Sequence, residues 1–365
     1  MNRFLLILVI VLLYLLTLTF LKPQIFSYKF DPSLIERYFC SQDIPTEPPC
    51  TRLFLSDGEI HIAAGYLYIT GADPTKIHFQ HPPFIKYLYG LTIVLTQNPY
   101  YLEILFGILY LCLTYILTLK LFHSLVIAGL TTLLLAFDPL FIFLSADVSL
   151  ELAQACLLLA YLFAVLYKKN NFLLQGIFLG LLASSKFWGA ALFFVLVLNG
   201  FNFIKKRFKP KIFLLQLLIG FLIFSLTYLK TFIDKGGLFN IFFFQLKMLN
   251  YWRHHSVTNV PFSSLSLFLA GFYKSWWGNQ LMVRTDTWLF LWPIMFFASF
   301  VKVIKFLRKR VINNEFLINL IPLIYLLYLG IQAPFPRYFI LILPFFYMTF
   351  VKWAVNFKPI KKCQF

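Results

Sequence analysis

The chain has 365 residues, of which 60% are hydrophobic and 13% charged, and its mean hydropathy is +0.79. Soluble domains carry about 25% charged residues, so this composition excludes a soluble enzyme. The net charge of +18 does not point to a nucleic-acid partner, because the basic residues lie in short clusters between apolar runs. That arrangement is typical of the positive-inside rule, and we predict an all-α polytopic membrane protein.

Apolar runs recur along the chain at the length of a membrane crossing. The first has no small-residue cleavage site after it, so it is predicted to be an uncleaved span and not a signal peptide. We count residues 172–203 as two crossings, because the clusters "YKKN", "IKKRFKPK", "KFLRKR" and "KPIKK" then share the side of Arg3. This count predicts a multi-pass protein of the plasma membrane with both termini in the cytoplasm. The roughly ten expected spans cover residues 4–21, 100–121, 124–144, 148–167, 172–185, 187–203, 211–232, 286–304, 315–331 and 336–355.

Two long polar loops, at residues 22–99 and 233–285, are predicted to form the extracytoplasmic face of one domain that spans residues 1–365. Loops of this length are usually functional or disordered. Their aromatic content favours short helices at the membrane interface over disorder. Cys40 and Cys50 bracket a polar stretch of the first loop and could form a disulfide, although spacing alone does not establish the pairing.

The first candidate site lies in "DGEIH". Asp57 and His61 are four residues apart and share one face of a helix, and Glu59 lies between them. Ala64 and Gly65 continue this face with small side chains, which we expect to leave room beside the carboxylate for a polar substrate. The alternative is a solvated acid next to a histidine with its own partners.

A rigid corner follows in "HPPFIK", where Pro82 and Pro83 exclude an ordinary helix. His81 and Lys86 flank this corner and are candidates for binding the phosphate of a lipid headgroup. The alternative is a lysine that snorkels at the interface.

A third group of acids lies in "FDPLFIFLSADVSLELAQ", at a predicted membrane boundary. Asp147 and Glu151 are four residues apart, and carboxylates at such a boundary are costly unless they are paired. The expected partner is Lys186 or Arg337, both at predicted outer span ends. A purely structural ion pair remains the alternative.

Together these stretches resemble a known family. "DGEIHIAAGYLYITG" and "HPPFIK" resemble the first outer loop of polyprenyl-phosphate-dependent glycosyltransferases of the GT-C superfamily, in its protein O-mannosyltransferase and aminoarabinose-transferase-like branch. "LLAFDPLFIFLSADVSLELA", "GLLASSKFWGAALF", "FFFQLKMLNYWRHH", "YKSWWGN" and "PRYFILILPFF" resemble later segments of that family in the same order. The resemblance runs from about residue 55 to residue 348.

The resemblance implies a bundle of transmembrane helices with surface helices that roof an outer cavity. It also implies the transfer of a sugar from a polyprenyl phosphate to an acceptor hydroxyl of a protein, lipid or glycan. Asp57 occupies the family's catalytic acidic position. The chain departs from the family at Gly58, where a Glu often follows the acid, and at Gln80, where many relatives have Glu. Some relatives use that Glu to contact a metal, so a divalent metal is possible here, and no other cofactor is implied.

The chemistry of such a transfer assigns roles to the remaining candidates. A hydroxyl nucleophile needs a base, for which Asp57 is proposed, and in-line attack would invert the sugar carbon. The phosphate leaving group needs cations. The candidates for binding the phosphate are His81, Lys86, Lys186 and Arg337. The candidates for orienting the acceptor or the base are Glu59, His61 and Glu151. The candidates for contacting the substrate from the second loop are His254, His255, Trp276 and Trp277, with membrane anchoring as the alternative for these aromatic residues.

Two other functions stay open. A transporter would also carry charges in many spans, but no inverted repeat is visible and the acids gather at one face. An inactive relative that only binds the lipid carrier fits the departures at Gly58 and Gln80. The sequence does not identify the sugar or the acceptor.

Overall fold

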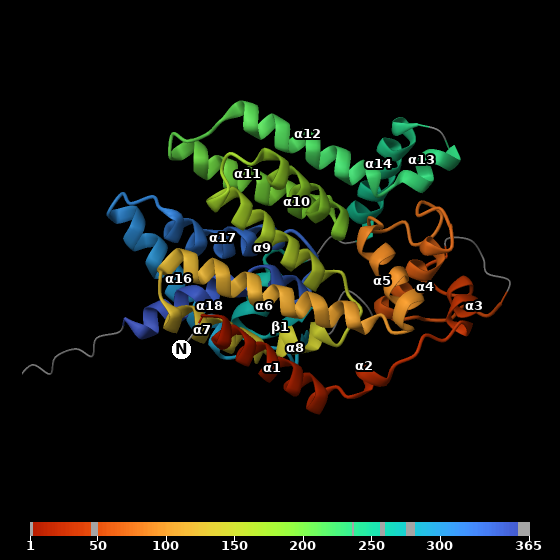
Figure 1. Ribbon diagram of the computed structural model, residues 1–365, viewed down its shortest axis with the longest axis horizontal. Coiled ribbons are helices and arrows are strands. Elements are labelled where there is room, and N and C mark those ends of the chain that lie inside the picture. The colour runs from red at the N-terminus through yellow and green to blue at the C-terminus, as the bar shows by residue number, and fades with distance from the viewer. Residues whose placement is uncertain (1–2, 45–49, 236, 256–259, 275–281, 357–365) are drawn as a thin grey trace, which may run out of the picture.

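The computed structural model describes residues 3–44, 50–235, 237–255, 260–274 and 282–356 (Figure 1). Within these ranges the chain forms eighteen α-helices and one 3-10 helix. The one sheet there is an antiparallel pair of short strands, β1 (Phe272–Lys274) and β2 (Met282–Arg284), with Tyr273 opposite Val283. The prediction of an all-α protein is confirmed.

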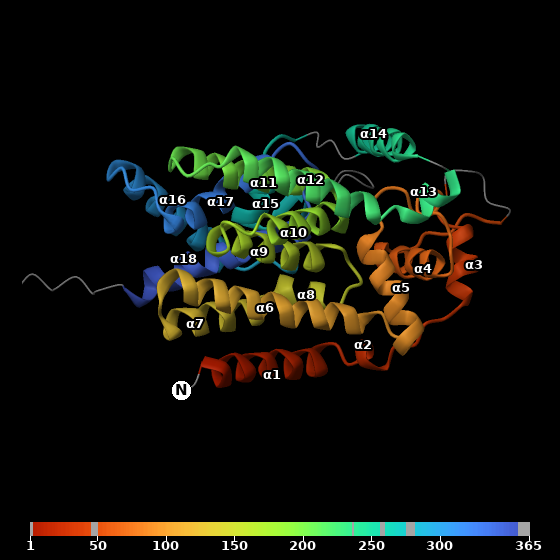
Figure 2. The ribbon, with the colours of Figure 1, turned by 45° about the horizontal axis from the view of Figure 1, so that its top comes forward.

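Most helices run side by side between two ends of the molecule (Figures 1 and 2). Each predicted span coincides with a helix, or a pair of consecutive helices, to within several residues. The start of α1 and the end of α18 lie at the same end of the bundle, at the left of Figure 1. These elements are α1 (Arg3–Leu21), α6 (Tyr100–Phe122), α7 (Leu125–Ala136), α8 (Pro139–Ser145), α9 (Glu151–Tyr167), α10 (Phe172–Ser185), α11 (Trp188–Ile204), α12 (Pro210–Leu226), α16 (Leu291–Arg308), α17 (Asn314–Leu329), η1 (Pro336–Leu341) and α18 (Leu343–Val355).

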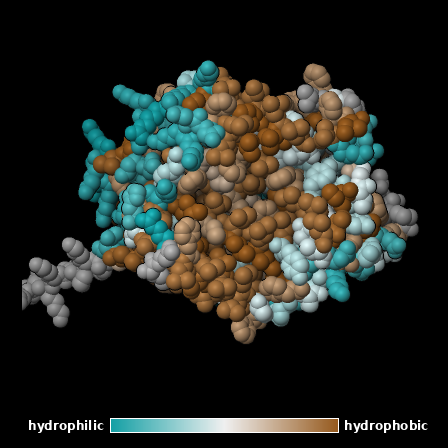
Figure 3. Space-filling model, in the orientation of Figure 1, coloured by the Kyte–Doolittle hydropathy of each residue, from teal (hydrophilic) through white to brown (hydrophobic). Residues whose placement is uncertain are grey.

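Length and composition single out few of these helices as complete spans. In the described part of the chain, α1 and α6 are long and apolar enough to cross a membrane on their own, and α7 with α8 passes as a third span bent by 63°. Seven further apolar helices have 10–17 residues. A broad apolar band nevertheless covers the face of the molecule seen in Figure 3, between two more hydrophilic ends. This surface is that of a multi-pass membrane protein.

The bend between α7 and α8 is built around Asp138. Its Oδ1 accepts the backbone N–H of Leu140 at 2.8 Å, which caps α8. Its Oδ2 accepts the Trp292 indole N–H at 3.1 Å and the Tyr347 hydroxyl at 2.7 Å. The side chain is fully buried, so Asp138 stabilises the bend and two neighbouring helices.

The other end of the bundle, at the right of Figure 1, carries the helices of the first polar loop together with α13 and α14. Cys40 and Cys50 form a disulfide there, with their Cα atoms 5.8 Å apart. One further short helix, α15 (Ser263–Ala270), packs against α16 and α17. The helices at the polar end are α2 (Gln24–Ser27), α3 (Ser33–Phe39), α4 (Asp57–Ile69), α5 (Phe84–Thr96), α13 (Leu229–Lys235) and α14 (Leu238–His255).

Candidate active site

The first turn of α4 presents Asp57 at the polar end of the bundle. Ser56 and Glu59 form a capping box: Ser56 Oγ accepts the Glu59 N–H at 3.3 Å, and Glu59 Oε2 accepts the Ser56 N–H at 2.9 Å. Glu59 also pairs with Arg37 at 2.8 Å. Asp57, in contrast, leaves 56% of its side chain exposed. The helix start therefore positions Asp57 for contact with a substrate, while Glu59 is engaged in holding that start.

Arg337 joins two carboxylates that are far apart in the chain. Its NH1 atom lies 2.6 Å from Asp57 Oδ2, and its Nε lies 2.8 Å from Glu151 Oε1. Lys186 Nζ contacts the same Glu151 oxygen. The two partners proposed for Glu151 from sequence are thus both present. Glu151 is only 2% exposed, so these two cations compensate a buried charge.

The pKa values of two carboxyl groups at this cluster, Asp57 and Asp147, are shifted in opposite directions. Partial burial would raise the pKa of Asp57, but Arg337 and His61 outweigh it, and the pKa lies below its ordinary value of 3.8. Burial and the nearby Glu151 raise the pKa of Asp147 to about 6. Asp147 Oδ1 lies 3.3 Å from the position that a Cβ atom on Gly58 would take, so it faces the first turn of α4. Asp57 is therefore fully ionised at neutral pH, and Asp147 is the more basic of the two groups.

His61 connects α4 to the segment that carries Asp147. Its Nδ1 lies 3.0 Å from the carbonyl oxygen of Val148, and its ring is buried. Burial lowers the pKa of His61 to about 4 although Asp57 acts in the opposite direction. The neutral ring with a proton on Nδ1 satisfies this carbonyl, so His61 orients the segment that precedes Glu151.

The expectation that Ala64 and Gly65 leave room beside the carboxylate is wrong. Ala64 is completely buried, and a Cβ atom on Gly65 would lie 2.6 Å from the carbonyl oxygen of Lys86 and 2.9 Å from the backbone nitrogen of Gly90. The small side chains let the backbones of α4 and α5 approach each other, so this face is filled by protein.

Lys86 lies inside the protein and does not face a membrane surface. Its side chain is fully buried, and its Nζ lies 2.8 Å from the carbonyl oxygen of His81 and 3.1 Å from Nδ1 of His78. The backbone of His78 is in the left-handed region, with φ of 39°. Lys86 therefore holds the turn before the proline corner from the inside, and this contact accounts for the strained residue in that turn.

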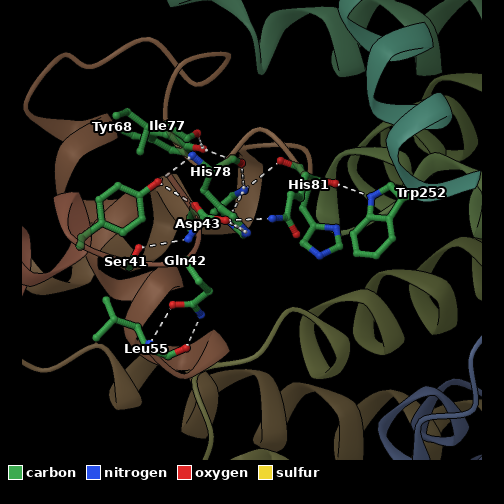
Figure 4. A network of polar contacts seen from close by, with 12 residues as sticks. Ser41, Gln42, Asp43, Leu55, Tyr68, Ile77, His78, His81 and Trp252 are labelled. Atoms are coloured by element: carbon green, nitrogen blue, oxygen red, sulfur yellow. Dashed lines mark hydrogen bonds and ion pairs between the residues drawn. The ribbon is translucent and has the colours of Figure 1, made fainter. Parts of the chain in front are cut away.

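A second set of polar contacts reaches the same turn from the first loop (Figure 4). Asp43 accepts hydrogen bonds from the Tyr38 hydroxyl at 2.8 Å and from Gln80 Nε2 at 2.9 Å. Trp252 of α14 donates its indole N–H to the Gln80 carbonyl at 2.7 Å and stacks on His81 with ring centroids 5.1 Å apart. The turn is thus held between the segment around Asp43 and α14. Asp43 and Trp252 were not predicted as site residues: Asp43 stands in none of the quoted motifs, and Trp252 stands in "FFFQLKMLNYWRHH", from which only His254 and His255 were selected.

The geometry does not fit the divalent metal that the resemblance left open. In the described residues, no group of three or more His, Cys, Asp or Glu side chains is arranged to hold a metal ion. The amide of Gln80 donates to Asp43, and the ammonium group of Lys86 lies against the ring of His78. Burial lowers the pKa of Lys86 to about 7, so below that pH a metal ion next to these histidines would meet a charged ammonium group.

A cavity of about 390 Å³ adjoins the charged cluster. Its wall combines cationic and donor groups with aromatic and apolar side chains. Lys186 Nζ lies 4.5 Å from the centroid of the Tyr338 ring. Burial and the charge of Lys186 lower the pKa of His81 well below its ordinary value, so this ring is neutral. The lining includes His81, Lys186, Trp252, Arg253, Tyr328 and Tyr338.

The structure brings some of the sequence-predicted residues together and leaves others apart. Asp57, Glu151, Lys186 and Arg337 form one contact cluster, and His81 shares a cavity with Lys186. In the second loop, His254 is exposed and does not line this cavity. The side chain of His255, and the whole of Trp276 and Trp277, lie outside the described residues.

No protein-family model and no curated protein matches the chain. Solved structures do match. ArnT from Cupriavidus metallidurans in the apo state has a TM-score of 0.62 at 14% identity, over 84% of this chain and 56% of that chain. The same protein bound to undecaprenyl phosphate has a TM-score of 0.61 at 14% identity, over 90% and 59%. The chain has the fold of ArnT.

The bundle of membrane helices that the motifs implied is therefore confirmed at the level of the fold. This chain spans little more than half of the length of the ArnT structures. An oligosaccharyltransferase from Archaeoglobus fulgidus in the apo form also matches, with a TM-score of 0.49 at 15% identity, over 81% of this chain and 46% of that chain.

Proposed function

We propose that this protein is a membrane glycosyltransferase that moves a sugar from a polyprenyl phosphate to an acceptor hydroxyl. The observation that carries the proposal is the Arg337 bridge: one guanidinium joins exposed Asp57 to buried Glu151, beside Lys186 and a cavity with apolar walls. The shared fold of ArnT, of which one structure is bound to undecaprenyl phosphate, supports a lipid-phosphate donor.

The cavity offers each part of such a donor a suitable surface. Lys186 lines the cavity and presents positive charge to a phosphate, Arg337 lies next to it across Glu151, and neutral His81 adds a hydrogen-bond donor. Apolar and aromatic residues of α14 and α17, such as Leu249 and Tyr328, line the remaining wall and suit an isoprenoid chain. Lys86 is proposed to act indirectly, because its contacts hold the turn that carries His81.

Asp57 is proposed as the general base. It takes the proton of the acceptor hydroxyl while the hydroxyl oxygen bonds to the first carbon of the sugar. The bond from that carbon to the phosphate oxygen breaks, and its electron pair stays on the phosphate. Attack from the face opposite the phosphate inverts the configuration at that carbon. Lys186 and Arg337 stabilise the charge that develops on the leaving phosphate.

The ion pair with Arg337 makes Asp57 a weak base before the donor arrives, because the pair lowers the pKa of this carboxylate. A donor phosphate next to Arg337 would compete for the guanidinium and leave Asp57 more basic. Donor binding and activation of the base are then coupled through one side chain. Glu151 keeps Arg337 in place during this exchange, because it contacts Nε and leaves the NH1 side toward Asp57.

Asp147 is a second candidate for the base. Its pKa of about 6 is closer to the pH at which a general base works best, and it faces the first turn of α4. Its partial burial and its position behind Gly58 make it the less accessible group. We therefore assign the proton transfer to Asp57 and treat Asp147 as the alternative to be tested.

The orientation in the membrane is also a proposal. The end opposite the site carries the basic turn 205–209 and the end of α16, which fits a cytoplasmic side with both termini there. The site then faces the extracytoplasmic space, and the acceptor is a protein, lipid or glycan on that side. Labelling of single cysteines at Asp31 and at Arg310 in intact cells by an impermeant reagent tests this: only the first should react.

The decisive experiment measures sugar transfer and donor hydrolysis by the purified protein in lipid bilayers with a panel of polyprenyl-phosphate sugars. Transfer should fall about 10²- to 10⁴-fold in Asp57→Asn. The matched control is Asp234→Asn, which removes a carboxylate paired with Lys230 on the surface of α13. Full activity in Asp57→Asn would contradict the base assignment. Donor binding without transfer in the wild type would favour the inactive relative, and no donor binding would favour the transporter.

A further inference from the structure

A second cavity lies far from the candidate active site, at the basic end of the bundle (left in Figure 1). It has a volume of about 410 Å³ and lies between the turn that joins α9 to α10 and the turn that joins α11 to α12. Four cations line it, and no carboxylate of the described chain does. These cations are Lys169, Lys206, Arg207 and Lys209.

The floor of this cavity is polar as well. Buried Gln175 donates its amide to the carbonyl oxygen of Lys168 at 3.1 Å, and Asn199 accepts from Gln216 at 3.3 Å. Lys209 donates to Asn170 Oδ1 at 3.1 Å, which links the two turns. A basic stretch that only marks the cytoplasmic side needs neither a cavity nor amide groups beneath it.

The turn between α11 and α12 holds its charges in place. Lys206 takes a left-handed backbone conformation with φ of 54°. Its N–H donates to the carbonyl oxygen of Phe203 at 2.9 Å, and the N–H of Arg207 donates to that of Asn202 at 2.8 Å. The like charges stay close although they repel: burial and the neighbouring Arg207 and Lys169 lower the pKa of Lys205. Such a cluster is stabilised by an anion.

The surroundings of the cavity indicate that the anion belongs to a lipid. Phe203 and Ile204 at the end of α11 are 70% and 61% exposed, and Leu214 in α12 is 63% exposed. These exposed apolar side chains are suited to contact with acyl chains. A free phosphate would make no use of them, whereas a phospholipid would contact both surfaces.

We propose that this basic cavity binds the phosphodiester headgroup of an anionic membrane phospholipid, with the acyl chains against the exposed end of α11 and the start of α12. The site is separate from the one that would hold the sugar donor, and the inference does not depend on the transferase activity. Arg207 also lines a neighbouring cavity of about 600 Å³ with Lys120 and Lys205, so it connects two basic surfaces.

The test compares two sets of substitutions that remove the same charge from the same end. The site variant combines Lys169→Gln, Lys206→Gln and Lys209→Gln. The control combines Lys305→Gln, Arg308→Gln and Lys309→Gln, which are exposed residues of α16 and its end that line neither cavity. Lipid retention is measured by native mass spectrometry of the full-length protein from micelles that contain phosphatidylglycerol and phosphatidylcholine in equal amounts.

The wild type and the control should retain phosphatidylglycerol preferentially, and the site variant should lose this preference at least about tenfold. A triple Lys→Arg variant at the site positions should keep it. Equal losses in site variant and control would overturn the proposal, as would equal retention of the two lipids by the wild type. Displacement of the lipid by millimolar inorganic phosphate would show a site for free phosphate instead. If the site variant does not fold, the lipid preferences of the wild type, the control and the arginine variant still test whether this cavity binds an anionic phospholipid.

Discussion

The two ends of this molecule carry charge in different ways. At the end with Asp57, acids and bases lie in contact, and several of them are buried. At the opposite end, the turns after α9 and α11 carry cations at the surface, and four of these line a cavity without a carboxylate among its described residues. The first arrangement keeps charges in place inside the protein, and the second leaves them available to a partner that brings its own negative charge.

The difference has a physical consequence. A buried ion pair contributes little net stability, yet removing one member leaves an uncompensated charge and is strongly destabilising. An exposed cation can be removed at almost no cost. Substitutions should therefore separate the two ends, and the predictions below run from the largest expected effect to the smallest.

Glu151→Gln should have the largest effect on stability. It leaves buried Lys186 without its carboxylate partner, and the free energy of unfolding should fall by about 3–5 kcal/mol. Thermal unfolding in a fixed detergent measures this. The double variant Glu151→Gln with Lys186→Met removes both charges and should recover much of the loss. No recovery in the double variant would mean that the pair itself is not the cause.

Arg337→Gln should lower transfer about 10²- to 10³-fold, because the phosphate loses a cation and Asp57 loses its partner. Arg337→Lys should restore the charge but not the simultaneous contacts with Asp57 and Glu151. Transfer by this variant should therefore remain well below that of the wild type. The comparison is of kcat/KM for the donor. Wild-type activity in the lysine variant would show that charge alone is sufficient.

Lys86→Gln should destabilise the protein by about 1–3 kcal/mol, since two carbonyl groups of the turn lose a buried donor. If Lys86 acts by positioning His81, the donor KM should rise more than kcat falls. Lys230→Gln on α13 is the control, because its pair with Asp234 is exposed. A loss confined to kcat would instead indicate contact with the reacting atoms.

The pH dependence should distinguish the two candidate bases. With Asp57 as base, the acid limb of kcat/KM lies below pH 4, because its pKa is below 3.8 in the free protein. With Asp147 as base, the limb lies near pH 6. We expect the lower limb in the wild type and an unchanged limb in Asp147→Asn. A limb near pH 6 that disappears in Asp147→Asn would reassign the base.

Asp147 should also affect stability with a defined sign. Its pKa in the folded protein is raised, so the folded state holds this proton more tightly than the unfolded chain does. Its contribution makes the free energy of unfolding fall as pH rises from about 4 to about 6 and stay constant above that. Asp147→Asn should remove this part of the slope, which is measured by denaturation at a series of pH values.

The smallest effect is expected at the basic end. The triple variant Lys305→Gln, Arg308→Gln and Lys309→Gln should change the free energy of unfolding by less than about 0.5 kcal/mol per residue, because these side chains are exposed. A loss comparable to that of Glu151→Gln would remove the contrast between the two ends.

The positions of the helices could be predicted well, because a run of apolar residues between polar clusters has few alternatives in a membrane. The helix lengths could not. Residues 124–144 read as one continuous span, but Asp138 and Pro139 divide it into α7 and α8, and the bend depends on partners from α16 and α18. Those contacts are distant in sequence.

Part of the candidate site could also be predicted, because charged residues stand out within apolar runs. Asp57 stands in a motif, and Glu151, Lys186 and Arg337 stand out as charges in apolar surroundings. Lys86 belongs to the same class, yet it turned out to support a turn from within. The residues around Lys86 in the sequence do not reveal that its ammonium group would donate to the carbonyl groups of His78 and His81.

The sequence by itself determined that this is a polytopic helical protein, which residues form its helices and which of its charges are exceptional, because hydropathy and charge are local properties. Only the tertiary structure decided which exceptional charges meet. Arg337 contacts Asp57 across 280 positions of the chain, whereas the small residues after Asp57 meet α5 and no substrate. Such pairings depend on how helices pack, and packing is a property of surfaces that no single segment carries.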